Sequence, residues 1–192
     1  MPAVDPSPPR TFDQVVVVSG HMIDRPGREK PRFPPTAEGR VTLAVRRQLD
    51  GWSLDRRSLL VTGGACGTDI IAAEQALELG STVWLLLARP LSEFVATSVH
   101  VDGTDWADRF AAVRDRSVVR VQDEEHEPLR GDDVYERTNG WLLDVAVSHA
   151  PAHRLRVLVV WDGEAPDGPG GTADFLERAK TLDADIAVLD PA

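Results

Sequence analysis

The sequence contains a single cysteine, Cys66, among 192 residues. One cysteine excludes an intrachain disulfide framework and fits a reducing compartment, so we expect a cytoplasmic protein. No apolar run reaches the roughly 18 residues of a membrane-spanning helix, so no membrane association is expected. The proline-rich N-terminus lacks the apolar core of a signal peptide, and residues 1–12 are expected to form a flexible leader outside the fold.

Basic residues and metal-binding clusters are also scarce. The chain has 21 Lys and Arg against 31 Asp and Glu, a net charge of -10, which argues against general nucleic-acid binding. His149 and His153 have metal-like spacing, but Pro151 breaks the helix that would align them, so we expect neither a metal nor a cofactor. The sequence also lacks a Walker A loop and a Gly-x-Gly-x-x-Gly dinucleotide fingerprint.

Strand-like runs alternate with helical patterns along the chain after the leader. The strand-like runs lie at 15–19, 58–62, 82–87, 117–121, 155–161 and 185–189. Helical patterns lie at 37–49, 68–79, from 104 onward, 133–149 and 172–182, with a short helix expected at 91–98. This order predicts an α/β fold, a Rossmann-like doubly wound and mostly parallel sheet of about six strands with helices on both faces. The length predicts one domain, residues 13–192.

The strongest functional signal is the turn Gly63-Gly-Ala-Cys-Gly-Thr-Asp69, which joins a predicted strand to a predicted helix. Glycines let the backbone approach a ligand, and the first N–H groups of a helix attract phosphate. Thr68 is a candidate helix cap or phosphate ligand, and Asp69 a candidate for ribose hydroxyls. The alternative is a turn that needs glycine only for its own conformation. Cys66 is expected to be a small buried residue rather than a reactive thiolate.

A second turn, Gly20-His21, precedes a locally basic loop that contains Arg28. An arginine fork matches phosphate oxygens, so Arg28 is a candidate phosphate ligand; the alternative is a solvated loop whose charges pair with acidic neighbours. His21 either contacts a base or phosphate or makes a structural hydrogen bond.

Further candidates follow the later strands. Asp162 is a candidate for ribose hydroxyls or a turn-forming residue, and the turn at Gly170 to Thr172 is a candidate for phosphate. Arg137 and Asn139 either reach the same rim or face solvent. The carboxyl ends of parallel strands meet at one rim, so we expect one ligand site there. The candidate ligand-binding residues are Gly20, His21, Arg28, Gly63, Gly64, Gly67, Thr68, Asp69, Asp162, Gly170, Gly171 and Thr172.

The order of Val18-Ser-Gly20, Gly63 to Asp69 and Gly170-Gly-Thr172 resembles the SLOG superfamily. These Rossmann-like domains include the LOG cytokinin-activating phosphoribohydrolases, the DNA-processing protein A fold and sensors of nucleotide-derived signals. The chain resembles more closely still a bacterial SLOG-like module that is often attached to tetratricopeptide-repeat or cyclase proteins. That similarity lies in Ser19-Gly-His-Met-Ile-Asp24, Asp105-Trp106, Tyr135-Glu-Arg137 and Trp161-Asp-Gly163, and it extends over nearly the whole chain after the leader.

The resemblance implies a cytoplasmic sensor or carrier domain, in bacterial signalling, that binds a nucleotide or nucleotide-derived ligand at the glycine rim. Fold analogy also implies a homodimer. The first alternative is a nucleotide N-glycoside hydrolase or transferase related to the LOG enzymes, with Asp162 or Asp174 as the catalytic acid. The second is an interaction module whose rim is blocked by side chains.

One departure from the LOG pattern weakens the enzyme alternative. LOG enzymes have a Pro-Gly-Gly-x-Gly-Thr-x-x-Glu motif with a catalytic Glu. Here the segment reads Pro169-Gly-Gly-Thr-Ala-Asp-Phe-Leu-Glu177 and lacks one glycine, so the motif does not assign the catalytic acid to Asp174 or to Glu177. We therefore favour binding over turnover.

Overall fold

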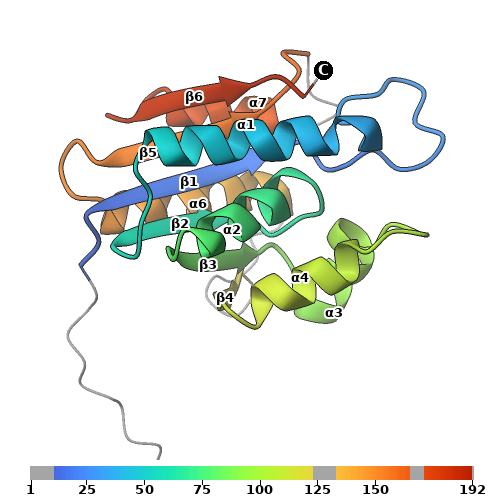
Figure 1. Cartoon of the computed structure of the whole chain (residues 1–192), viewed down its shortest axis with the longest axis horizontal. Coiled ribbons are helices and arrows are strands. Elements are labelled where there is room, and N and C mark those ends of the chain that lie inside the picture. Colours follow the sequence, from blue (N-terminus) through green and yellow to red (C-terminus); the bar gives the residue numbers. More distant parts are fainter. Residues whose placement is uncertain (1–10, 123–132, 165–170, 192) are drawn as a thin grey trace, which may run out of the picture.

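The computed structural model describes residues 11–122, 133–164 and 171–191. One sheet of six strands runs in the order β4-β3-β2-β1-β5-β6, and every neighbouring pair is parallel (Figure 1). The strands are β1 (Gln14–Gly20), β2 (Ser58–Thr62), β3 (Thr82–Leu87), β4 (Val118–Val121), β5 (Leu155–Val160) and β6 (Asp185–Leu189). The predicted doubly wound α/β fold is confirmed.

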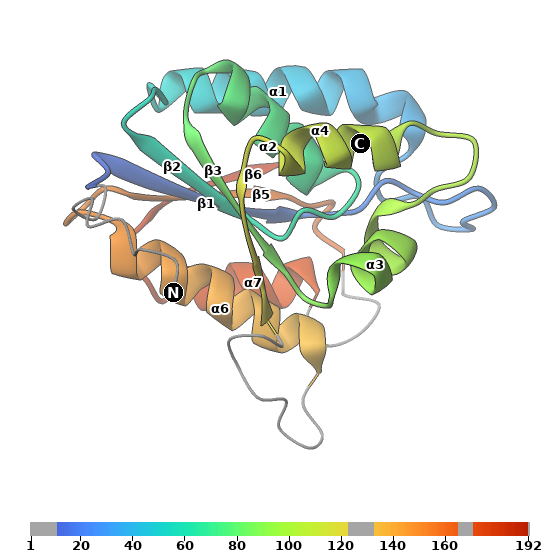
Figure 2. The same cartoon turned by 90° about the horizontal axis from the view of Figure 1, so that it is seen from below.

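Helices cover both faces of this sheet. They are η1 (Pro35–Ala37), α1 (Glu38–Gly51), α2 (Thr68–Glu78), α3 (Leu91–Phe94), α4 (Trp106–Arg114), α6 (Val134–His149) and α7 (Thr172–Ala179). The short helix expected near residue 91 is α3, which continues as a π-helical segment, η2 (Val95–Val99). Figure 2 shows α1, α2 and α4 on one face, and α6 and α7 on the other. None of the helices in the described ranges has the length and apolarity needed to cross a bilayer.

The apolar run in β1 explains why this strand lies at the centre. Val16 and Val18 pack into the core under α1 and α2, whereas Val15 and Val17 pack into the core over α6 and α7. All four valines are fully buried. A parallel strand covered on both faces needs such a continuous apolar run. At the sheet edge, by contrast, Val188 of β6 is half exposed.

The strand order places a topological switch point between β1 and β5. After β4 at one edge, the chain passes through α6 and returns to pair β5 with β1. Gly20 at the end of β1 pairs with Val160 at the end of β5. Ligands of doubly wound sheets bind beyond the carboxyl ends of the strands near such a point, and Asp162 and His21 both lie here.

The packed part of the chain begins slightly earlier than expected. Phe12, which the sequence assigns to the leader, is only 7% exposed, and its ring centroid lies 6.4 Å from that of Trp84 in β3. An aromatic side chain buried to this extent belongs to the core of the domain.

Gly67 offers a direct test of the turn before α2. Its φ is +95°, and an added Cβ would lie 2.5 Å from the backbone nitrogen of Ile23. We expect Gly67→Ala to lower the free energy of unfolding by about 2 kcal/mol or more, because both the conformation and the overlap are unfavourable. Gly39→Ala in α1, where a Cβ meets nothing within 4 Å, should instead raise it by about 0.5–1 kcal/mol. Urea denaturation measures both values, and equal effects of the two substitutions would contradict this account of the turn.

Candidate functional site

A pocket of about 170 Å³ lies at the carboxyl ends of the central strands, and we call it the rim pocket. It brings together segments that are far apart in the sequence. Of the twelve candidate ligand-binding residues, those that line it are Gly20, Gly63, Asp69, Gly171 and Thr172. The ends of β1 and β2 and the starts of α2 and α7 therefore meet at one concave site, as the sequence predicted for the rim.

The other wall of the rim pocket comes from α6, which the sequence placed there only as one of two alternatives. Tyr135, Thr138 and Asn139 line the pocket, whereas Arg137 is not among the lining residues. Asn139 is 7% exposed, and its Nδ2 donates to the carbonyl of Gly171 (3.3 Å) and to Oδ2 of Asp174 (3.1 Å). This amide therefore fixes the start of α7 against α6. The position of Asn139 in the first turns of a long helix was the one available sequence signal.

Asp69 is the ionisable group at the centre of the site. Its Oδ2 accepts a hydrogen bond from the backbone N–H of Ala65 (3.1 Å), while Oδ1 is fully buried. The residue is 9% exposed. Burial raises the pKa of Asp69 to about 7, and hydrogen bonds with the Ala65 N–H, the Thr62 side chain and the Gly64 backbone offset that effect only in part. A carboxyl that titrates near neutrality in a pocket is typical of functional sites.

The hydrogen-bond donors of the turn before α2 donate to carbonyl groups of the protein itself. Both the N–H and the hydroxyl of Thr68 donate to the carbonyl of His21, at 3.2 and 2.9 Å. The N–H of Ile70 donates to the carbonyl of Ala65 (3.3 Å), and that of Cys66 to the carbonyl of Ser98 (2.8 Å). The N-cap residue is Gly67 and no side chain caps the helix, so the expected capping role of Thr68 is wrong. Thr68 is buried behind the pocket wall.

Three of the candidate glycines are explained by contacts within the chain. A Cβ on Gly20 would lie 2.6 Å from Oγ1 of Thr68 and 2.7 Å from the carbonyl oxygen of Val160. Gly64 faces the core, where a Cβ would lie 3.4 Å from the ring of Phe110, and Gly67 packs against the backbone after β1. Close packing within the chain thus explains why these three positions are glycine. This agrees with the alternative that the glycines of the turn serve its own conformation.

Asp162 and His21 bind each other across the switch point. Nε2 of His21 lies 3.0 Å from Oδ1 of Asp162, and Nε of Arg32 lies 3.6 Å from Oδ2. Burial raises the pKa of Asp162, but the hydrogen bond with His21 and the charge of Arg32 outweigh it, so that the pKa lies below its ordinary value. Neither His21 nor Asp162 lines the rim pocket. Their mutual contact ties the ends of β1 and β5 together.

The remaining candidates lie elsewhere. Asp174 does not line the rim pocket, and its Oδ1 accepts from Nε of Arg178 at 2.9 Å. Gly170 falls outside the described residues. Cys66 is fully buried, and burial raises its pKa to about 11, which agrees with an unreactive turn residue. Within the described ranges, His, Cys, Asp and Glu side chains form no group of three that would hold a metal ion.

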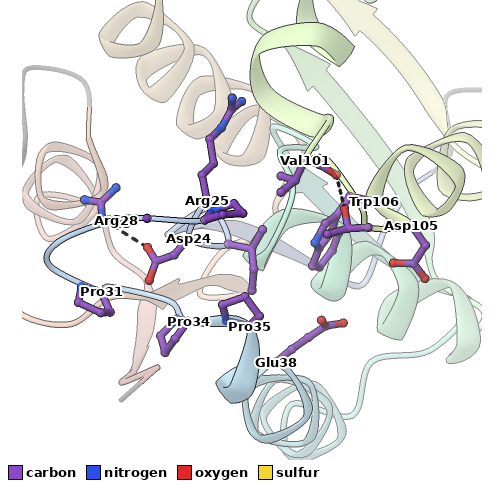
Figure 3. A pocket seen from close by; sticks show the side chains of 14 residues that line it. Asp24, Arg25, Arg28, Pro31, Pro34, Pro35, Glu38, Val101, Asp105 and Trp106 are labelled. Atoms are coloured by element: carbon purple, nitrogen blue, oxygen red, sulfur yellow. Dashed lines mark hydrogen bonds and ion pairs between the residues drawn. The ribbon is translucent and has the colours of Figure 1, made fainter.

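Arg28 lines a second and larger pocket, of about 440 Å³, beside the loop after β1. Figure 3 shows its opposite walls, formed by Pro31, Pro34 and Pro35 on one side and by Val101, Asp105 and Trp106 on the other. Nε of Arg28 lies 3.4 Å from Oδ1 of Asp24. The structure therefore does not bring Arg28 to the rim pocket with the other candidates.

The raised pKa of Asp69 predicts a specific pH dependence of stability. Between about pH 4 and 7 the folded protein holds a proton that the unfolded chain releases, so this carboxyl lowers the free energy of unfolding as pH rises. Asp69→Asn removes the effect, and its stability relative to the wild type should rise by on the order of 4 kcal/mol from pH 4 to 8. Urea denaturation at several pH values measures this. Asp108→Asn, in the exposed first turn of α4, is the matched control, and its stability should depend on pH as that of the wild type does. If the free energy of unfolding changes with pH equally in the wild type and Asp69→Asn, the raised pKa of Asp69 is refuted.

Comparison with known proteins adds evidence on the fold. No family model matches the chain, and no curated protein matches it in sequence. Among solved structures, it is similar to DNA processing protein A from Streptococcus pneumoniae, with a TM-score of 0.52 and 17% identity over 92% of this chain. The chain spans half the length of that protein. The Moco carrier protein from Chlamydomonas reinhardtii matches with a TM-score of 0.38 and 13% identity, over 93% of this chain and 91% of the other. The chain therefore has a Rossmann-like fold similar to that of DNA processing protein A, which is one of the folds that the sequence motifs resemble.

Proposed function

We propose that the chain is a cytoplasmic sensor or carrier domain that binds a nucleotide or nucleotide-derived ligand in the rim pocket. The observation that carries this proposal is the convergence of Gly63, Asp69, Gly171 and Thr172 on one concave site at the strand ends. Ligands of doubly wound sheets bind at this edge. Because this rim holds an open pocket, the alternative of an interaction module with a rim blocked by side chains is disfavoured.

The size and lining of the rim pocket suit part of a nucleotide rather than all of it. Its volume of about 170 Å³ is below the roughly 300–1,000 Å³ of pockets that enclose drug-sized ligands. A sugar or a phosphorylated sugar would enter, and the remainder of the ligand would lie outside. Tyr135 lines the pocket and is 40% exposed, so it offers an aromatic face to a base there.

One observation favours an enzyme as the second candidate. A buried carboxyl with a pKa of about 7 is matched to proton transfer at neutral pH, and Asp69 has such a pKa inside the pocket. Asp162 and Asp174 are instead held by His21 and Arg178 outside it. In a nucleotide N-glycoside hydrolase built on this site, Asp69 would be the acid or base.

The binding proposal is tested by thermal shift against AMP, ADP, ATP, NAD, ADP-ribose, cyclic nucleotides and ribose phosphates. A ligand at about 100 times its Kd stabilises the folded state by about 2.7 kcal/mol, which raises Tm by several degrees in a domain of this size. We expect a selective shift for at least one compound. A flat response across the panel would contradict a nucleotide site.

A pocket-filling variant locates the binding. Thr172→Trp places a large side chain in the rim pocket and should abolish the shift. Thr181→Trp, at an exposed threonine after α7, is the matched control and should retain it. If Thr172→Trp responds like the wild type, the ligand binds elsewhere on the chain.

Turnover separates the two candidate functions. A hydrolase would release ribose 5-phosphate and free adenine from AMP, detected by chromatography, and Asp69→Asn should then lower the rate about 100-fold or more. Asp162→Asn should keep most of the activity, because Asp162 lies outside the pocket. Binding without product formation favours a sensor or carrier, and loss of turnover in Asp162→Asn alone would disprove the assignment to Asp69.

A further inference from the structure

The second pocket, of about 440 Å³, lies between the loop after β1 and the segment before α4, and we call it the loop pocket. It shares no lining residue with the rim pocket. Its volume falls within the roughly 300–1,000 Å³ of sites that enclose small ligands. The residues that carry the proposed function all line the rim pocket, so the loop pocket is available to a different ligand.

One wall of the loop pocket is a proline loop in a fixed conformation. Its prolines offer an apolar surface to the pocket, and those on this wall are Pro31, Pro34 and Pro35 (Figure 3). The buried carboxylate of Asp24 holds the loop, because its Oδ2 accepts from the N–H groups of Arg32 (2.9 Å) and Phe33 (3.0 Å). A wall that is already ordered loses little conformational entropy when a ligand binds.

The opposite wall presents an unpaired hydrogen-bond donor. Trp106, the first residue of α4, lines the pocket, and only 2% of its surface is exposed. Its indole N–H makes no hydrogen bond with any described residue, yet the nitrogen is not one of the fully buried atoms that lack a partner, so it remains accessible from the pocket. Figure 3 shows the ring with its nitrogen toward the space between the two walls. An indole N–H can only donate, so this part of the pocket requires an acceptor.

Arg109 fixes the position of Trp106 and of a neighbouring carboxylate. The central carbon of its guanidinium lies 3.9 Å from the centroid of the Trp106 ring. Nη1 donates to Oε1 of Glu38 (2.6 Å), while Nη2 and Nε donate to the two carboxylate oxygens of Glu74 (2.7 and 2.8 Å). One guanidinium therefore joins the Trp106 ring to the carboxylate of Glu38, which also lines the loop pocket.

This end of the loop pocket carries a net negative charge. Asp105 lines the pocket at the N-cap position of α4, but its side chain does not cap the helix. Its carboxylate forms no ion pair or hydrogen bond with the part of the chain that the structure describes. Arg109 is shared between Glu38 and Glu74, so its single charge does not neutralise this end. Figure 3 shows Glu38 and Asp105 on the Trp106 side of the pocket, where a cationic group is therefore favoured.

The basic residues of the loop pocket are engaged away from these carboxylates. Nη2 of Arg25 donates to the carbonyl of Thr97 (3.0 Å), and Nε of Arg28 lies 3.4 Å from Oδ1 of Asp24. Figure 3 shows both guanidinium groups away from the two carboxylates beside Trp106. Neither arginine offsets the negative charge there, so the site favours a cation over an anion.

We propose that the loop pocket binds a compound in which a protonated α-amine is next to a carbonyl group. The ammonium lies at Glu38 and Asp105, the carbonyl oxygen accepts from the indole N–H of Trp106, and an apolar side chain lies against the prolines. Asp105 precedes Trp106 in the chain, and Arg109 joins Glu38 to the same ring. The sites for the ammonium and the carbonyl are therefore adjacent, as the two groups are in an amino acid. The ligand class is an amino-acid amide, either as a small molecule or as the N-terminal residue of a peptide.

Three matched probes test the loop pocket by isothermal titration calorimetry at about pH 6.5, where the α-amine is protonated. Leucinamide carries all three groups, N-acetyl-leucinamide lacks the cation, and isopentylamine lacks the carbonyl. The wild type should bind leucinamide about tenfold more tightly than either of the others.

Two variants separate the contributions of the donor and the carboxylate. Trp106→Phe keeps an aromatic ring but removes the N–H, and it should lower the preference over isopentylamine to less than about threefold. Asp105→Asn, at an exposed position, should lower the preference over N-acetyl-leucinamide by about threefold or more. Asp108→Asn, in the same turn of α4 but outside the pocket, is the matched control and should bind all three probes like the wild type.

Nuclear magnetic resonance of the wild type locates the binding without relying on the folding of a variant. Of the indole N–H signals of the five tryptophans, that of Trp106 should move most on titration with leucinamide. A larger shift at another tryptophan, no binding of leucinamide, equal wild-type affinity for the three probes, or unchanged preferences in folded Trp106→Phe would each overturn the proposal.

A tripeptide distinguishes the two sources of the ligand. If the amide of Leu-Gly-Gly binds about tenfold more tightly than leucinamide, the ligand is the N-terminus of a peptide. Equal or weaker binding of the tripeptide identifies a small amino-acid derivative. No compound of the nucleotide panel has an α-amine next to a carbonyl group, so the loop pocket and the rim pocket are tested independently.

Discussion

The contact between the end of β1 and the start of α2 determines the geometry of the site. The carbonyl of His21 accepts from both the N–H and the hydroxyl of Thr68, and the N–H of Ile23 donates to the carbonyl of Cys66 (3.2 Å). Met22 and Gly67 form a β-bridge between the same segments. This close approach requires glycine at position 67, and it places Asp69 in the first turn of α2 with its carboxyl in the rim pocket.

That contact has an electrostatic consequence. The N–H of Thr68 at the start of α2 donates to a carbonyl of the chain and is therefore not available to an anion. The N–H of Ala65 is likewise occupied, because it donates to the carboxyl of Asp69. The helix dipole stabilises a carboxylate at this position, yet burial dominates and raises its pKa to about 7. The start of α7 is held against α6 by Asn139, whose Nδ2 donates to the carbonyl of Gly171.

The sequence predicted the fold well because burial on both faces leaves a simple pattern. The continuous valines of β1 and the alternation of strands and helices determine a parallel sheet, and the turns after parallel strands must meet at one rim. The rim pocket was predictable to this extent. The sequence could not predict which glycine lines the pocket, because Gly63 and Gly64 are adjacent and of the same type. They differ only in the residues that surround them in the fold. The partners of Asp162 were equally hidden, since ion pairs between residues far apart in the sequence depend on tertiary packing. The pair of Arg28 with Asp24 is local and agrees with the alternative in which the charges of this loop pair with acidic neighbours.

Asp69 is difficult to explain by its structural role alone. A turn that needed only an acceptor for the Ala65 N–H would be satisfied by a neutral side chain, without the cost of burying a carboxyl that ionises near pH 7. The second oxygen of the carboxyl, Oδ1, is fully buried, so solvent does not stabilise its charge. Such a group lowers stability at neutral pH, and proteins concentrate costs of this kind at functional sites.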